Sequence, residues 1–178
     1  LPVSPLAADI WRLDLNDEEL TQLLGNRLEQ DTIASLVTQI QEFKQAMAKR
    51  PIGQKGLDTL NQLIPRMLEY MLEHHAHQLD SLVARVTSII INIAGRTTYL
   101  QLLEENQGAS AQLIKLCAAS PWIADQINRF PMLLDELLNP ISLFNPPKFE
   151  EYMEGGEALP EAQAAEDKSD DEQDKVDQ

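Results

Sequence analysis

The sequence predicts an all-α protein, an irregular multi-helix bundle with a long central helix, followed by a disordered acidic C-terminal tail. Three observations support this prediction. Apolar residues recur at the three- and four-residue spacing of a helix face over much of residues 14–148. No segment shows the alternation of apolar and polar residues that is typical of a half-buried strand. From residue 149 onward, acidic residues accumulate and large apolar side chains become rare.

The first 13 residues contain Pro2 and Pro5 and are predicted to be an entering linker. Asn16 and Glu19 then have the spacing of a capping box, in which the first side chain accepts a bond from the helix and the carboxylate reaches back. This pair predicts a short helix that begins there and ends near Arg27.

Two longer helices are expected next. Asp31 is a candidate N-cap, and the helix after it should end near Arg50 because Pro51 disfavours the α conformation in the residue before it. The following apolar stripe covers residues 57–72. Pro65 lies inside this stripe and predicts a kink or a split in the helix.

The longest periodic stretch runs from Leu79 to Leu103 and predicts a central, largely buried helix. Residues 89–91 are three isoleucines, which also suit a strand, but the helical spacing on both sides favours a helix. Gly95 is expected to loosen this helix near its middle.

Shorter helices are expected at residues 109–118, 122–129 and 132–138. Ser120 is followed by a proline, a combination that predicts an N-cap and the first helical residue. Pro131 gives the same kind of start signal for the last of these helices.

The end of the chain differs in composition from the rest. Residues 149–178 contain 12 acidic and 2 basic side chains and account for most of the net charge of −15. Such a segment cannot bury enough apolar surface to offset the entropy of ordering, which predicts disorder; the alternative is a conditional helix rich in alanine and glutamate. The predicted organisation is a linker at 1–13, a helical domain at 14–148 and an acidic tail at 149–178.

Composition also argues against several classes of protein. The chain has no stripe of lysine and arginine for nucleic acid, no apolar run long enough to span a membrane, and no visible signal peptide. Its single cysteine, Cys117, fits a reducing compartment, so we expect a cytoplasmic protein. The chain begins with Leu1, and we expect that it has been cut from a longer chain or processed.

No catalytic or metal site is predicted. The histidines at 74, 75 and 77 could share a metal ion, but nothing completes a set of four ligands, so a solvated helix end is favoured. Cys117 is expected to be a small packing residue, because nothing near it in sequence lowers the pKa of its thiol. Phosphate-cradling glycine motifs are absent from the sequence as well.

Two charged sites leave alternatives open. Arg96 lies in an apolar stripe, which favours a structural role in which it binds a carboxylate or the carbonyls of a helix end. The alternative is that Arg96 is presented to an anionic ligand or a partner. Asp135 and Glu136 likewise form either the polar face of an amphipathic helix or a docking surface.

Three strings of residues resemble a known family. They are Arg-Thr-Thr-Tyr-Leu from Arg96, Leu-Cys-Ala-Ala-Ser-Pro-Trp-Ile-Ala from Leu116, and Arg-Phe-Pro-Met-Leu-Leu-Asp-Glu-Leu-Leu from Arg129. In this order the strings resemble the central helical region of the bifunctional glutamine synthetase adenylyltransferase/adenylyl-removing enzyme, over about residues 10–150. The family-motif residues, which are candidates for interaction, are Arg96, Thr97, Thr98, Tyr99, Ser120, Trp122, Asp135 and Glu136.

The resemblance implies two nucleotidyltransferase domains elsewhere in such an enzyme. One attaches AMP to glutamine synthetase and the other removes it, with ATP and Mg²⁺ serving the full-length enzyme. A helical region connects these catalytic domains and helps transmit signals from glutamine and the PII protein. The family's catalytic signature, a Gly-Ser turn before an Asp-x-Asp pair, has no counterpart here, so no catalytic residue is carried over. After Tyr152 the sequence is expected to depart from the family.

Two hypotheses follow from the sequence. The first is a helical connector or regulatory segment of that enzyme, inactive alone, with Gly95 and Pro65 as candidate pivots. Its partners would be glutamine synthetase, PII and the family's catalytic domains. The second is a stand-alone helical binding module whose acidic tail engages a basic partner or acts as a solubilising tail. A third, weaker interpretation is an enzyme in its own right.

Overall fold

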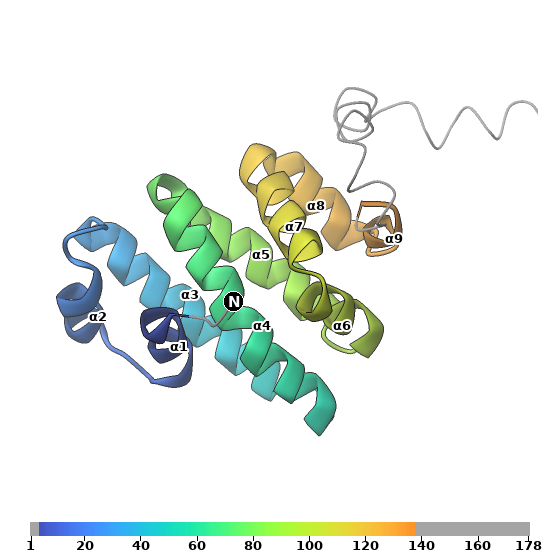
Figure 1. The fold of residues 1–178 in the computed structure, drawn as a ribbon, viewed down its shortest axis with the longest axis horizontal. Coiled ribbons are helices and arrows are strands. Elements are labelled where there is room, and N and C mark those ends of the chain that lie inside the picture. The colour runs from blue at the N-terminus through green and yellow to red at the C-terminus, as the bar shows by residue number, and fades with distance from the viewer. Residues whose placement is uncertain (1–3, 138–178) are drawn as a thin grey trace, which may run out of the picture. The chain divides into compact units, whose positions relative to one another are not determined.

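The computed structural model describes residues 4–137, and within this range every regular element is helical. Figure 1 shows the elements in chain order, from blue to orange. Their bounds are α1 Pro5–Arg12, α2 Asp17–Leu24, α3 Gln30–Ala48, α4 Gln54–His74, a 3₁₀ turn η1 at Ala76–Gln78, α5 Leu79–Ile93, α6 Thr97–Glu105, α7 Gln107–Ala119, α8 Pro121–Arg129 and α9 Leu133–Leu137. The prediction of an all-α fold is confirmed for the described residues.

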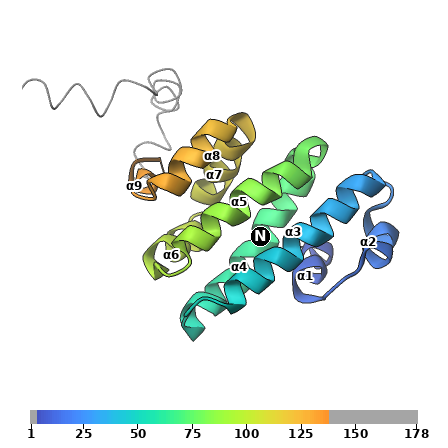
Figure 2. The same ribbon diagram turned by 180° about the vertical axis from the view of Figure 1, so that it is seen from behind.

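Helix α5 occupies the centre of this arrangement. It packs against α3, α4, α6, α7 and α8, while α4 packs against α1, α6 and α7. Both views place α1 and α2 beside α3 and α4 on one side and α7 and α8 beside α5 on the other (Figures 1 and 2). A displacement on either side of the described body therefore acts on the same central helix.

The apolar face of α5 explains its central position. Seven of its large apolar residues are at most 2% exposed and recur at spacings of three and one, at Leu79, Leu82, Val83, Val86, Ile89, Ile90 and Ile93. Ile91 is half-buried. Burial of one such side chain contributes about 1.5–3 kcal/mol. The helical interpretation of the isoleucine run at 89–91 is confirmed.

Two predicted caps are confirmed. The Asn16 side chain accepts a hydrogen bond from the Glu19 backbone N–H at 2.8 Å, and α2 begins at the next residue. Ser120 accepts from the Ile123 backbone N–H at 3.2 Å, and Pro121 is the first residue of α8. In each case a side-chain oxygen satisfies a donor that the first helical turn leaves without a partner.

The prediction of a linker at residues 1–13 is wrong for residues 5–12, which form α1. Ser4 is the N-cap and Pro5 the first helical residue, a position where the missing N–H costs nothing. Ile10 and Trp11 are buried against the neighbouring helices. The proline that suggested a linker is the start of a helix.

The predicted N-cap of the next helix is also wrong. Helix α3 begins at Gln30, one residue before Asp31, and Glu29 occupies the N-cap position without a side-chain cap bond. Asp31 instead lies in the first turn, where its negative charge is favourable near the positive end of the helix dipole.

The long helix predicted from Leu79 to Leu103 is two helices. Helix α5 ends at Ile93 and α6 begins at Thr97, with Gly95 in the turn between them. The apolar spacing continues across this turn, since Leu100 and Leu103 are also buried. Glycine disfavours helix by about 1 kcal/mol, so the chain can turn at residue 95 with little loss.

The longest described helix is instead α4, with 21 residues. It continues through Pro65, whose ring is buried, so the predicted split does not occur. The predicted boundary at residue 149 and the disorder of the acidic tail lie outside the described residues.

Candidate functional site

Three of the predicted interaction residues meet where α6 approaches α9. The Tyr99 hydroxyl on α6 donates a hydrogen bond to Oδ2 of Asp135 on α9, at 3.2 Å. The guanidinium carbon of Arg96 lies 5.9 Å from the centre of the Tyr99 ring, within the range of a cation–π contact. We call Arg96, Tyr99 and Asp135 the α6–α9 contact; its hydrogen bond is exposed to solvent.

The other predicted residues lie beside this contact or away from it. Thr97 and Thr98 are exposed in the first turn of α6, and Glu136 is exposed next to Asp135. Ser120 serves as the N-cap of α8. Trp122, on the first turn of α8, is 44% exposed. The structure therefore gives Ser120 a structural role and leaves Trp122 as an exposed aromatic side chain.

Two other arginines have a structural role of the kind that was expected for Arg96. Nη1 of Arg66 donates to the backbone carbonyl of Glu104 at 2.6 Å, and Nη2 lies 3.6 Å from the carboxylate of that residue. Nη1 of Arg85 donates to the backbone carbonyl of Cys117 at 2.9 Å. These carbonyls belong to the last turns of α6 and α7, which have no partner within their own helix. Each arginine therefore fastens one helix to the end of another.

Sequence reasoning missed these two arginines although the signal was present. Arg66 is flanked by the buried residues Pro65 and Met67, and Arg85 lies between the buried residues Val83 and Val86. A cation among buried apolar neighbours needs a partner, the same argument that singled out Arg96. Which carbonyl serves as that partner depends on tertiary packing and cannot be read from the sequence.

A second missed feature is a polar connection between α5 and α8. Nδ2 of Asn92 donates to Oδ1 of Asn128 at 2.7 Å, and Nδ2 of Asn128 donates to the Ser88 hydroxyl at 3.1 Å. Ser88 and Asn92 are four residues apart and lie on one face of α5. Asn128 thereby holds α8 in register with α5.

Cys117 is fully buried, and burial raises the pKa of its thiol to about 12 despite the opposing influence of the Arg85 charge. The thiol is therefore protonated at neutral pH and is a poor nucleophile. This environment agrees with the expected packing role.

The three histidines cluster at the junction of α4 and η1. The rings of Tyr70 and His74 are 4.5 Å apart, and the rings of His75 and His77 are 6.5 Å apart, measured between centroids. Burial lowers the pKa of His75, and the positive charges of His74, His77 and Lys115 lower it further. Among residues 4–137, no group of three or more histidine, cysteine or acidic side chains could hold a metal ion.

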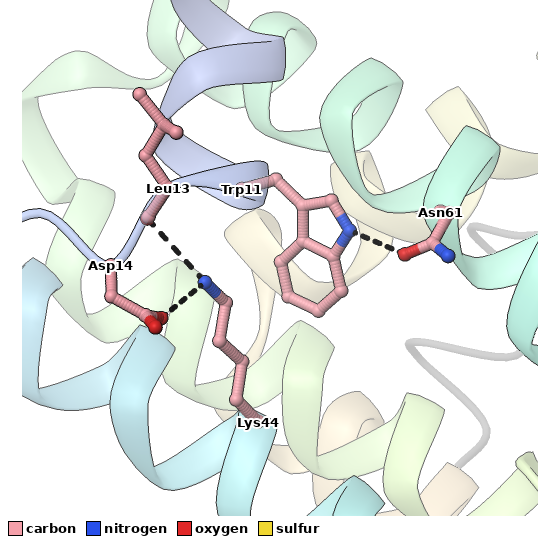
Figure 3. A network of polar contacts seen from close by, with 5 residues as sticks. All are labelled: Trp11, Leu13, Asp14, Lys44 and Asn61. Carbon is pink, nitrogen blue, oxygen red and sulfur yellow. Dashed lines mark hydrogen bonds and ion pairs between the residues drawn. The ribbon is translucent and has the colours of Figure 1, made fainter.

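A further polar cluster joins α1 to α3 and α4 (Figure 3). The Lys44 ammonium lies 3.1 Å from the Asp14 carboxylate and 5.3 Å from the Trp11 ring centre, and it also donates to the Leu13 carbonyl. The Trp11 indole N–H donates to Oδ1 of Asn61 at 3.1 Å. The adjoining cavity has a volume of about 10 Å³, which is the space of one water molecule. The bonds of this cluster connect α1 to α3 and α4.

None of the helices in the described part of the chain has the length and apolar character needed to cross a membrane.

Comparisons with known proteins agree on one family. The family model described as glutamate-ammonia ligase adenylyltransferase matches residues 110–175. The bifunctional glutamine synthetase adenylyltransferase/adenylyl-removing enzyme of Alteromonas mediterranea is 43% identical over 135 residues, which are 76% of this chain and 14% of that enzyme. The enzymes of the same name from Psychromonas ingrahamii and Shewanella oneidensis are 40% and 37% identical over 146 and 145 residues, each match covering 82% of this chain and 15% of the relative.

These matches confirm the predicted family and correct the prediction of where the resemblance ends. The family model extends to residue 175, past Tyr152, where the sequence was expected to depart from the family. The chain spans only about one seventh of the length of these relatives. The chain therefore belongs to the glutamine synthetase adenylyltransferase family, as the counterpart of a segment of its much longer members.

Proposed function

We propose that this chain is a non-catalytic helical connector or regulatory segment of a bifunctional glutamine synthetase adenylyltransferase/adenylyl-removing enzyme. The observation that carries the proposal is the identity of 37–43% to a stretch that makes up only 14–15% of each relative. The sequence of this stretch lacks the catalytic signature expected of the family's nucleotidyltransferase domains. Its contribution would then be to position other parts of the enzyme.

The contacts of α5 support such a role. This helix is bound to α7 through the Arg85 bond to the Cys117 carbonyl and to α8 through Ser88, Asn92 and Asn128. Its apolar face packs on α3, which in turn packs on α2. Polar bonds of this kind fix the register of neighbouring helices, and a connector needs fixed register in order to pass a displacement from one side to the other.

The partners and cofactors of this proposal come from the family. Glutamine synthetase is named as the target of the relatives, and PII and glutamine are the effectors that the resemblance implies. ATP and Mg²⁺ would act in the catalytic domains of the full-length enzyme, which would also contact this segment. The cytoplasmic location expected from the sequence stays a prediction.

An activity assay tests the absence of catalysis. The purified chain is incubated with glutamine synthetase, ATP or inorganic phosphate, Mg²⁺, glutamine and PII, and AMP transfer and phosphorolysis are followed. We expect no turnover above the blank, while the full-length Alteromonas enzyme works in parallel. Turnover by the chain alone would show that it contains a catalytic site and would refute the connector proposal.

A deletion separates the connector from the stand-alone binding module. Removing residues 149–178 should leave binding to glutamine synthetase and PII unchanged if the helical body makes the contacts. A binding module that works through its acidic tail would lose affinity on this deletion, and the remaining binding would no longer depend on salt concentration. Calorimetry of both forms at two ionic strengths distinguishes these results.

A further inference from the structure

The turn between α3 and α4 gathers positive charge on a protein that is otherwise acidic. Lys49, Arg50 and Lys55 lie within seven residues, and no acidic residue occurs from residue 43 to residue 57. The whole chain, by contrast, has a net charge of −15. Both ribbon views show this turn at one edge of the described helices (Figures 1 and 2). We call residues 49–57 the cationic turn.

The three cations of the turn are available to a partner. All three side chains are exposed, and among residues 4–137 none of them forms an ion pair. The next acidic residue along the chain, Asp58, accepts a hydrogen bond from the Gln54 side chain at 2.8 Å. Lys44 on α3 differs, because its ammonium lies 3.1 Å from the Asp14 carboxylate. The carboxylates of the described helices thus leave the charge of the turn unneutralised.

The backbone of the cationic turn is held in one shape. The Ile52 N–H donates to the Arg50 carbonyl at 2.8 Å, and the Leu57 N–H donates to the Gly53 carbonyl at 3.1 Å. Gly56 is buried beneath the Ile52 side chain, and a Cβ atom at residue 56 would lie only 2.8 Å from Cγ2 of Ile52. The turn therefore presents its charges from a fixed backbone, which lowers the entropy lost when a partner binds.

The surroundings of the cations define the kind of partner. Leu57 is 38% exposed in the first turn of α4, so an apolar side chain accompanies the positive charges. This first turn has no acidic residue and no side-chain cap, so the positive end of the helix dipole adds to the potential. Three cations are few for nucleic acid, and a net charge of −15 repels a phosphate backbone. Carboxylates that flank an apolar side chain on a polypeptide suit this surface.

We propose that the cationic turn is the docking surface for an acidic polypeptide segment located elsewhere in the full-length enzyme. The shared stretch makes up only 14–15% of each relative, so most of such an enzyme lies outside this chain. Carboxylates of the docked segment pair with Lys49, Arg50 and Lys55, and an apolar side chain covers Leu57. The inference rests on the proposed connector role, since a connector has to contact the parts that it links.

A peptide titration of the full 178-residue chain, followed by NMR, tests the docking surface. The probe is an acetylated peptide with the repeating sequence Glu-Glu-Leu. We expect saturable shifts of the Arg50, Ile52 and Lys55 amides, with an affinity that falls as salt is added, because exposed charges are screened. The comparison ligands are the same peptide with glutamine in place of glutamate, and inorganic phosphate. Both should bind about tenfold more weakly, because neither can form all the charge pairs.

Removing the positive charges tests their role in peptide binding. The triple substitution Lys49→Gln, Arg50→Gln and Lys55→Gln should weaken binding of the glutamate peptide about tenfold, since it removes three exposed charge pairs. The three side chains make no ion pair within the described residues, so the variant should fold as the wild type does. Far-UV circular dichroism checks the fold.

A matched control separates the turn from the net charge of the chain. The triple substitution Arg12→Gln, Arg27→Gln and Lys115→Gln removes the same charge from exposed cations that form no ion pair among residues 4–137. This variant should bind the peptide as the wild type does. A control that loses as much affinity as the turn variant would mean that only net charge matters, and the docking surface would be refuted.

The location of the partner segment is tested in the full-length enzyme. A chimera of the Alteromonas enzyme carries residues 10–150 of this chain, with a photoreactive amino acid in place of Gln54, which is exposed at the start of α4. Irradiation should cross-link this position to a segment of the same polypeptide that contains several acidic residues, identified by mass spectrometry. Cross-links confined to glutamine synthetase or PII, or no cross-link within the enzyme, would overturn the proposed location.

Three results of the titration would also overturn the proposal. Without a saturable shift from the glutamate peptide, the turn binds no acidic segment. Equal affinity for phosphate would make it a site for small anions, and equal affinity for the glutamine peptide would make the contact apolar. None of these results changes the activity assay of the isolated chain. A failed docking surface is therefore distinguishable from a failed connector proposal, which turnover by the chain alone would reveal.

Discussion

Helix α6 makes two polar contacts with its neighbours, and they differ in location more than in chemistry. At its C-terminal end, Arg66 of α4 reaches the carbonyl and the carboxylate of Glu104, and the side chains of this pair are only 25% and 22% exposed. Near its N-terminal end, Tyr99 donates to Asp135 of α9 in a hydrogen bond that is exposed to solvent. Both contacts join a hydrogen-bond donor to an oxygen on another helix.

The difference between the two contacts indicates how much each of them contributes to stability. Breaking the Arg66 contact leaves charged and polar groups partly shielded from water, which is costly. Breaking the Tyr99 contact returns both groups to water at small cost. The Arg66 contact between α4 and α6 should therefore contribute more to the free energy of unfolding than the Tyr99–Asp135 hydrogen bond between α6 and α9.

The largest effect should come from comparing two buried leucines, Leu103 on α6 and Leu134 on α9. Both are fully buried. Leu103→Ala should lower the free energy of unfolding by about 2–5 kcal/mol, because it leaves a cavity in the cooperative core. Leu134→Ala should lower it by less than Leu103→Ala, because α9 is joined to α6 through an exposed hydrogen bond and its backbone can close part of the cavity. Urea unfolding followed by far-UV circular dichroism measures both values; equal losses would contradict this difference.

The next effect concerns the two arginines that form ion pairs on different parts of the surface. Arg66→Ala should lower the free energy of unfolding by about 1–3 kcal/mol, since it removes a half-buried bond to a helix-end carbonyl. Arg129→Ala is the control: its pair with Asp125 is 66% and 54% exposed and should contribute about 0–1 kcal/mol. The same urea titration gives both results, and a control as damaging as Arg66→Ala would remove burial as the explanation.

A smaller effect is expected at the connection between α5 and α8. Asn128→Ala removes the bonds to both Ser88 and Asn92 and should lower the free energy of unfolding by about 1 kcal/mol. Asn92→Ala removes the bond to the Asn128 side chain and a longer one to the Asn128 carbonyl at 3.4 Å, and it should cost less because both are exposed to solvent, whereas the Asn128–Ser88 bond is partly buried. If thermal unfolding gives the opposite order, Asn128 does not hold the register of α8.

The smallest effect is the pH dependence that His75 introduces. Its pKa in the folded chain lies below the ordinary value of 6.5, so between these two pKa values the unfolded chain binds a proton that the folded chain does not. Stability from this group is therefore complete above pH 6.5 and is lost as the pH falls below it. An NMR titration of the His75 ring should give a midpoint under 6.5, and the His75→Gln variant should lose less stability on acidification than the wild type. A midpoint above 6.5 would contradict this assignment.

The elements that sequence reasoning predicted correctly are those determined by local chemistry. Asn16 and Ser120 cap their helices because the side chain acts on a backbone N–H only three residues away. The buried face of α5 follows from apolar spacing within one helix. Neither feature requires knowledge of any distant part of the chain.

The failures arise where one signal has two structural outcomes. Pro5 suggested a linker, but proline also starts helices, and burial of Trp11 against α3 and α4 decides the outcome. The helical spacing of apolar residues continues across the turn at Gly95, because both α5 and α6 bury apolar residues in the same core. At the candidate site, Tyr99 and Asp135 are 36 positions apart, so only the packing of α6 and α9 brings them together.

A chimera tests the connector proposal most directly. Residues 10–150 of this chain would replace the matching segment of the full-length Alteromonas enzyme, to which the chain is 43% identical. The connector proposal predicts that the chimera adds AMP to glutamine synthetase, removes it, and still responds to glutamine. A chimera that folds like the parent enzyme and carries out both reactions without any response to glutamine or PII would contradict the regulatory role. One that folds but has lost both reactions would contradict the assignment of this segment as a connector.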